Sequence, residues 1–273
     1  MALQQNVTQE RRLTRVEEIQ LLASVVQVNT NLGLPPLDRD GEFLKVHDLD
    51  EYLIGLGQPD DDANNTFTGR LLLLLESRCV FGDEVYQSVL TSCIERYWID
   101  YNDHADSFVP AFLLNDILRF WRILCVNYEA GSSPLPEKRR TKNYKLKHSR
   151  LLTCFSAVLA LQVEYGRQKT ISPDRALELL RMTPIERIEF AKEFSRVDRS
   201  KFDRLLALYA DFLQETDIPK GNLVEKMKGA EYYRKTLDDA RKFGDVMYEI
   251  LESAAKRSEG DISDWRFLRY ITV

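Results

Sequence analysis

The sequence is poor in the residues that zinc sites need. It has four cysteines and three histidines in 273 residues, and no two cysteines form a Cys-x-x-Cys pair. These counts argue against a structural zinc site. Each cysteine stands in an apolar helical stretch, so we expect reduced, buried thiols, which are typical of a cytoplasmic protein.

Long apolar segments are also missing. The run LLLLL at 71–75 is bounded by Arg70 and Glu76, whereas a membrane span needs about 20 apolar residues. The first residues, MALQQNVTQERRL, have no apolar centre, so no signal peptide is expected. The sequence therefore predicts a cytoplasmic protein without a membrane partner.

Glycine and proline are scarce, at 12 and 9 residues, while charged residues make up 30% of the chain and hydrophobic residues 44%. This composition favours an all-α fold with a sizeable core. The net charge of -5 argues against a globally basic nucleic-acid protein but allows a local basic patch. We predict a multi-helix bundle of about nine or ten helices. GEFLKV at 41–46 is the only strand candidate.

Capping signals place several helix ends. Thr14 and Glu17 form a capping-box pattern, Ser172 precedes Pro173, and Thr183 precedes Pro184, which are typical helix starts. The segment GSSPLPEKRRTKNYK at 131–145 reads as a loop. We expect two parts, residues 1–168 and 169–273. The expected helices lie near 14–32, 48–57, 66–78, 84–98, 113–129, 146–166, 173–180, 184–190, 199–215 and 223–257.

Polar residues interrupt one helical stretch, LLNDILRFWRILCVNYE at 113–129. At helical spacing, Asn115, Asp116, Arg119 and Arg122 fall opposite a wide apolar arc. Two arginines one turn apart make a fork suited to phosphate or carboxylate, and Asp116 can hold Arg119 in place. The same pattern also fits an ordinary ion pair on a solvated face.

A basic run follows between positions 138 and 150. Seven of its residues are lysine or arginine, and no acid lies between Glu137 and Glu164. This asymmetry indicates attraction to polyphosphate, either a nucleotide or a nucleic-acid backbone. The alternative is a solvated loop. Its members are Lys138, Arg139, Arg140, Lys142, Lys145, Lys147 and Arg150.

Acidic residues gather between positions 38 and 62, and oxygen clusters of this kind suit Mg²⁺. Asp48 and Asp50 form an Asp-x-Asp pair, which two-metal phosphoryl transfer requires on a strand end. The pair also resembles the first turn of a helix, where residues i and i+2 do not share a face. Asp48 and Asp50 are therefore candidates for metal ligands and catalytic residues, with the first turn of a helix as the alternative. No Gly-x-Gly-x-x-Gly, P-loop, Gly-x-Ser-x-Gly or His-Glu-x-x-His motif occurs.

A longer pattern points to a family. The block DRDGEFLKVHDLDEYLIGLGQPDDDANNTFTGRLLLLLESRCVFGDEVYQSVL, then FVPAFLLNDILRFWRILCVNYE and KNYKLKHSRLLTCFSAVL, resembles the helical region after the catalytic core of bacterial nucleotidyltransferase-like proteins. These are relatives of the uridylyl- and adenylyl-transferases that modify regulatory proteins. The resemblance covers roughly residues 33–165, and FTGRLLLLLES and LLNDILRFWRILCVNYE carry most of it.

The resemblance does not include that family's catalytic signature. The family's polymerase-β-like domain has a Gly-Ser turn, an Asp-x-Asp pair and a third carboxylate. Here Gly131-Ser132 lacks a downstream pair, and Gly41-Glu42 before Asp48 and Asp50 has Glu in place of Ser. Only about 30 residues precede the matching block, too few for a mixed sheet.

The resemblance implies a helical accessory or binding protein of a nucleotidyltransferase-type system. It would bind a nucleotide, a nucleic acid or a protein acceptor, with a separate catalytic chain as a further partner. One alternative is a divergent Mg²⁺-dependent nucleotidyltransferase using Asp48 and Asp50; otherwise no cofactor is expected. Another is a helical scaffold or homo-oligomer whose C-terminal helices make the contacts. The residues implied for binding are Asn115, Asp116, Arg119, Arg122, Lys142, Lys145 and Lys147.

Overall fold

A computed structural model gives the fold, and its described part is entirely helical, without strands. The predicted all-α class is confirmed. By its contacts the chain divides into two units, residues 1–51 and 52–273. The structure describes residues 13–35, 37, 41, 44–47, 52, 53, 55–58, 61, 66–130 and 135–256.

The first unit contains helix α1 (Arg15–Asn31). The predicted capping box is present: Glu17 N donates to Thr14 Oγ1 at 3.4 Å, and Thr14 N donates to Glu17 Oε2 at 2.7 Å. No residue of α1 is buried. Within the expected strand, residues 44–46 form no regular element, so the strand is not found there. Asp48 and Asp50 lie outside the described residues.

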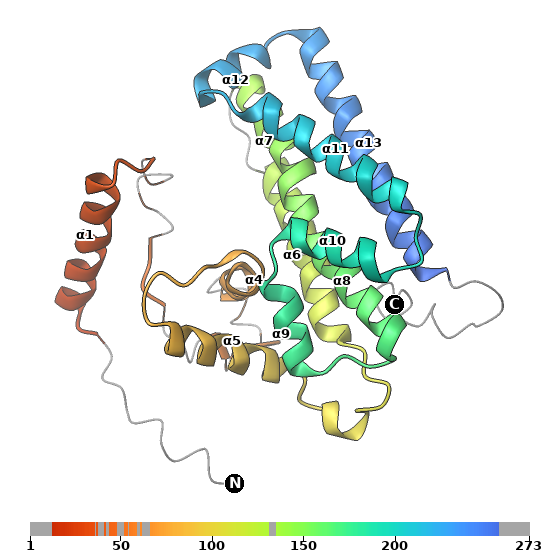
Figure 1. The fold of residues 1–273 in the computed structure, drawn as a ribbon. Helices are drawn as coiled ribbons and strands as arrows, with labels where there is room; N and C mark the ends of the chain where they lie inside the picture. The colour runs from red at the N-terminus through yellow and green to blue at the C-terminus, as the bar shows by residue number, and fades with distance from the viewer. Residues whose placement is uncertain are drawn as a thin grey trace. The chain divides into compact units, whose positions relative to one another are not determined.

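The second unit is a bundle of helices joined mostly by short turns (Figure 1). One short π-helical segment, η3, connects α7 and α8 without a break. The elements are α4 (Thr66–Glu76), α5 (Asp83–Tyr97), the 3-10 turn η2 (Tyr101–Asp103), α6 (Ala111–Ala130), α7 (Pro136–Lys145), η3 (Leu146–Arg150), α8 (Leu151–Gln168), α9 (Pro173–Arg181), α10 (Pro184–Phe194), α11 (Arg199–Thr216), α12 (Lys220–Lys226) and α13 (Ala230–Ala255).

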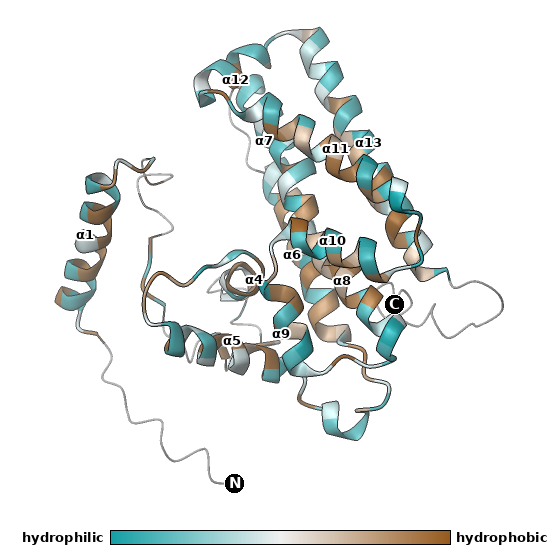
Figure 2. Cartoon of the chain, viewed as in Figure 1, coloured by the Kyte–Doolittle hydropathy of each residue, from teal (hydrophilic) through white to brown (hydrophobic). Residues whose placement is uncertain are grey.

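Helix α8 lies at the centre of this unit. Nearly every residue from Leu151 to Tyr165 is buried, and α4, α6, α9, α10 and α13 pack around it. Hydrophobic residues are frequent along α8, whereas α12 is mainly hydrophilic (Figure 2). One hydrophobic core extends from Phe67 to Ile250. The expected division between residues 168 and 169 falls inside this shared core.

A second, smaller core holds α12 and the ends of α7 and α11 together. Its buried members are Tyr144, Phe212, Leu223 and Met227. Helices α11 and α13 run side by side and both contribute to the main core, and α12 lies against α7 (Figure 1). This arrangement places the basic segment of the sequence beside α13.

Three local expectations are wrong. Residues 136–145 are helix α7 rather than a loop, because Pro136 at the first position fits a helix start and the Glu, Lys and Arg residues after it favour a helix. The long helix expected at 223–257 is two helices, since the chain breaks after Met227 and restarts after Gly229. Cys79 lies between α4 and α5, not within a helix.

Arg187 of α10 joins four helices through backbone carbonyls. Its side chain is completely buried, and it donates to Leu179 O at 3.1 Å, Thr153 O at 3.3 Å and Leu75 O at 3.3 Å, and also to Leu180 O. Three of these carbonyls belong to the last turns of α4 and α9, which lack intrahelical partners. Arg187 therefore caps two helix C-termini at once.

Candidate functional site

The polar strip predicted on α6 is present but divided. Arg119 lies 3.9 Å from Asp116, as the spacing predicted, and its guanidinium lies 4.2 Å from the ring centroid of Phe67 in α4. Arg122 and Asn115 are exposed, and Arg122 makes no ion pair in the described part of the chain. The strip therefore contacts α5 through Asp116 and α4 through Arg119, and its other two residues are exposed.

Asp116 belongs to a buried network centred on Arg70. Arg70 is fully buried and binds both carboxylate oxygens of Asp61, which is 3% exposed. Its Nε donates to the hydroxyl of Tyr97 at 3.3 Å, and that hydroxyl donates to Asp116 Oδ2 at 2.7 Å. Thr66 also donates to Asp61 at 2.7 Å.

The pKa shifts in this network follow from burial and from these contacts. Burial raises the pKa of Asp116, and the hydrogen bond from Tyr97 and the nearby arginines only partly oppose it. Burial also raises the pKa of Tyr97 well above its ordinary value. Burial lowers the pKa of Arg70, but its contacts with Asp61 and Tyr97 raise that pKa overall. Asp116 and Arg119 thus end a network that fixes α4, α5 and α6 in place.

The basic segment presents two different faces, because it is helical. Lys138, Lys142 and Lys145 stand at positions i, i+4 and i+7, so they share one face of α7, and all three are exposed. Arg140, Tyr144 and Lys147 have the same spacing but are offset by two residues. This second set therefore lies on the opposite side of the helix.

The π-helical turn is built around His148. Its ring is stacked on Phe212 at 4.5 Å between centroids and on Phe243 at 5.0 Å, and Tyr144 meets it edge-on at 4.7 Å. His148 Nδ1 lies 2.9 Å from the carbonyl oxygen of Tyr144. Burial lowers the pKa of His148, against opposing contributions from Tyr144 and Asp239. The aromatic cluster fixes how η3 faces α11 and α13.

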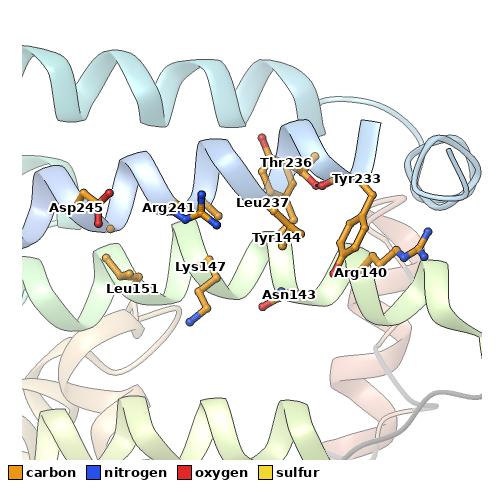
Figure 3. A pocket seen from close by; sticks show the side chains of 12 residues that line it. Arg140, Asn143, Tyr144, Lys147, Leu151, Tyr233, Thr236, Leu237, Arg241 and Asp245 are labelled. Atoms are coloured by element: carbon orange, nitrogen blue, oxygen red, sulfur yellow. The ribbon is translucent and has the colours of Figure 1, made fainter. Parts of the chain in front are cut away.

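A groove of about 300 Å³ lies between this segment and α13. Figure 3 shows one wall formed by α7, η3 and the start of α8, and the other by α13. Along α13 the groove extends over about 18 Å, from Tyr233 to Asp245. Its lining residues are Arg140, Asn143, Tyr144, Lys147, Leu151, Tyr233, Thr236, Leu237, Ala240, Arg241, Gly244 and Asp245.

Three cations and one carboxylate line the groove. Arg140 Nη1 donates to Met227 O at 2.8 Å, and its guanidinium lies 4.4 Å from the Tyr233 ring centroid, so it is held in place. Lys147 points away from α13 (Figure 3), with Nζ 5.6 Å from the Trp121 ring centroid. Arg241 is exposed and lies 3.3 Å from Asp238, an exposed pair that binds weakly.

The middle of the groove is apolar and open. Leu151, Leu237 and Ala240 line it, and Leu237 is 36% exposed. Around Gly244 the space is empty, since a Cβ there would have no atom within 4 Å. Glycine within a helix costs about 1 kcal/mol relative to alanine. The groove thus combines an apolar middle with cationic residues in its lining.

Only part of this groove was predicted from the sequence. Lys147 lines it, whereas Lys142 and Lys145 lie on the exposed face of α7. Arg241 and Tyr233 were missed because they stand in a charged helix whose polar residues read as a solvated face. The i, i+4, i+7 spacing of Arg140, Tyr144 and Lys147 is the signal that would have separated the two faces.

No metal site accompanies the groove in the part of the chain that the structure describes, where no group of three or more His, Cys, Asp or Glu residues converges. Asp48 and Asp50 lie outside that part, so their role stays a prediction. Cys79, Cys93, Cys125 and Cys154 are all free thiols. Among the described helices, none has the length and apolar character to cross a membrane.

We expect the fold to lose stability in mild acid through His148. Its pKa in the folded protein lies below the ordinary 6.5. As pH falls below about 6.5, the unfolded chain takes up a proton that the folded protein does not, so the free energy of unfolding falls until the folded pKa is reached. Urea unfolding at pH 7.5 and 5.5 should show a larger loss for the wild type than for His148→Phe.

The raised pKa of Asp116 has the opposite effect: because folding favours its protonated form, it raises the free energy of unfolding as pH falls. Asp116 is present in both proteins, so its contribution cancels in the comparison. Equal losses in the wild type and in His148→Phe would show that His148 does not titrate as described.

Comparison with protein-family models, with curated proteins and with solved structures gives no match to this chain.

Proposed function

We propose that this chain is a cytoplasmic helical binding protein that takes up a nucleotide in the groove between α7–α8 and α13. The observation that carries the proposal is that Arg140, Lys147 and Arg241 all line one groove of about 300 Å³ with an apolar middle. Guanidinium and ammonium groups bind phosphate. The apolar middle offers a surface for a flat base.

The size of the groove favours a nucleotide over a nucleic acid. Its volume lies at the lower end of the range for small-molecule sites. The exposed row of Lys138, Lys142 and Lys145 extends over only about 10 Å, too short to neutralise many phosphates. Since the chain as a whole carries a net charge of -5, a long polyanion would be repelled elsewhere on the surface.

The resemblance to nucleotidyltransferase-like proteins supports the choice of a nucleotide. In this proposal the chain is an accessory protein, and a separate chain supplies the catalytic carboxylates and Mg²⁺. Arg119 and Arg122 stay candidates for contact with an acceptor. The alternatives, a divergent enzyme using Asp48 and Asp50 and a helical scaffold, gain no support from the residues that the structure describes.

A binding titration with groove variants tests the proposal. We expect fluorescently labelled ATP or GTP to bind the wild type, and Arg140→Gln/Arg241→Gln to weaken binding at least about tenfold, because two charge-assisted contacts are lost. Gly244→Leu should weaken binding similarly by filling the groove without changing charge. Fluorescence anisotropy at fixed ionic strength measures both effects.

The matched control is Arg199→Gln/Arg204→Gln, which removes the same charge from exposed positions of α11 that do not line the groove. It should leave the affinity within about twofold of the wild type. Equal weakening by the control, or unchanged binding by Gly244→Leu, would refute a groove site. Tighter binding of single-stranded RNA than of every nucleotide would reassign the protein as a nucleic-acid binder.

A further inference from the structure

The groove between α7–α8 and α13 carries opposite charges at its two ends. Arg140 lies over the ring of Tyr233 at one end, and Asp245 lies about 18 Å further along α13. Figure 3 shows Asp245 and Leu151 at one end of the groove, and Arg140 and Tyr233 at the other. A carboxylate repels phosphate. A nucleotide bound in this groove would therefore direct its phosphates away from Asp245.

The carboxylate of Asp245 is accessible to a ligand. Asp245 is exposed, and it makes no hydrogen bond or ion pair in the part of the chain that the structure describes. Arg241 stands one turn earlier on the same helix, but it pairs with Asp238 instead. An ionised carboxylate only accepts hydrogen bonds, through two oxygens. Both oxygens of Asp245 are thus open to N–H donors from a ligand.

The space beside Asp245 suits a flat ring. A Cβ on Gly244 would have no atom within 4 Å, so this part of the groove is open. Leu151 lines the same end from the opposite wall (Figure 3), and Ala240 lies one turn before Gly244. These side chains offer apolar contact to the faces of a base. Its edge would then meet the carboxylate.

The common bases differ in what their pairing edges offer to a carboxylate. Guanine has two adjacent donors, N1–H and the 2-amine, which match the two oxygens of one carboxylate. Adenine and cytosine have an amine beside a ring nitrogen that only accepts, and uracil has one N–H between two carbonyl oxygens. Such acceptors would face the carboxylate without a proton between them. A carboxylate at this place therefore discriminates in favour of guanine.

We infer that the groove selects guanine nucleotides and that Asp245 is the residue that reads the base. Asp245 accepts from guanine N1–H and from the 2-amine, while the ring lies against Leu151 beside the open space at Gly244. The phosphates extend towards Arg241 and Arg140. The inference rests on the proposed nucleotide site, and adds the identity of the base and the direction of the ligand.

Equilibrium titrations of the full chain with GTP, ATP and XTP test the inference. GTP should bind the wild type at least about tenfold more tightly than ATP. Asp245→Asn should lose about tenfold in affinity for GTP, while its affinity for ATP should not fall. The same variant should gain affinity for XTP, because the Asn amide donates to the carbonyl that replaces the 2-amine and still accepts from N1–H.

The matched control is Glu231→Gln, which removes the same charge from an exposed position of α13 that does not line the groove. It should leave the ratio of GTP to ATP affinity unchanged. Equal binding of GTP and ATP, or an unchanged ratio in Asp245→Asn, would overturn base selection. If Gly244→Leu still weakened binding in that case, the groove would stand as a nucleotide site. Failure of all three nucleotides to bind would overturn both proposals.

Discussion

Arg187→Met should lower the free energy of unfolding by about 4 kcal/mol or more. The substitution leaves the buried carbonyls of Leu75, Leu179 and Leu180 without the donor that they have at the helix C-termini, and each unpaired group costs about 1–3 kcal/mol. Two helix C-termini also lose a cation. Burial lowers the pKa of Arg187 to about 10, so the guanidinium is charged at neutral pH. Urea unfolding followed by circular dichroism measures the loss.

The variant Arg187→Lys separates geometry from charge. An ammonium keeps the charge but cannot span carbonyls from α4, α8 and α9 as a planar guanidinium does, so an intermediate loss is expected. Arg181→Met is the matched control, because Arg181 is exposed, and should change stability by less than about 0.5 kcal/mol. A loss below about 1 kcal/mol for Arg187→Met would contradict the capping role.

Breaking the Arg70–Asp61 pair should cost about 3–5 kcal/mol of unfolding free energy. Asp61→Asn keeps the shape of the side chain but leaves the guanidinium of Arg70, which is fully buried, without its counter-charge. Arg70→Met likewise leaves the Asp61 carboxylate, which is 3% exposed, without its counter-charge. Urea unfolding of both single variants measures the cost.

The double variant Arg70→Met/Asp61→Asn distinguishes an uncompensated charge from lost packing. It should be more stable than the sum of the single losses implies, because removing both partners leaves no isolated buried charge. Strict additivity of the two single losses would show that the residues do not depend on each other. In that case the strip with Asp116 and Arg119 would not be fixed by this network.

Much of the fold follows from local signals. The capping boxes at Thr14 and Thr183 and the Ser172–Pro173 start lie where the sequence predicts them, since capping depends on residues within one turn. Helix α7 was missed because glycine, serine and proline at 131–136 outweighed the helix formers after them. The break at Gly229 was missed because charged residues continue on both sides.

Contacts between residues far apart in the sequence limit how much of the site could be predicted. In the sequence, Arg70 stands directly before an apolar run, yet in the fold it pairs with Asp61 from an acidic segment. Nothing in local spacing joins these two residues. Likewise Arg140 and Arg241 stand about 100 residues apart, and only the packing of α7 against α13 brings them to one groove. The predicted Asp116–Arg119 contact was found because both residues share one helix.

Photo-cross-linking with 8-azido-ATP, mapped by mass spectrometry, tests the groove most directly. The account predicts saturable labelling of peptides within 138–151 and 233–245, which unlabelled ATP competes away and Gly244→Leu abolishes. Labelling confined to other peptides, or unchanged in Gly244→Leu, would contradict a nucleotide site between α7–α8 and α13.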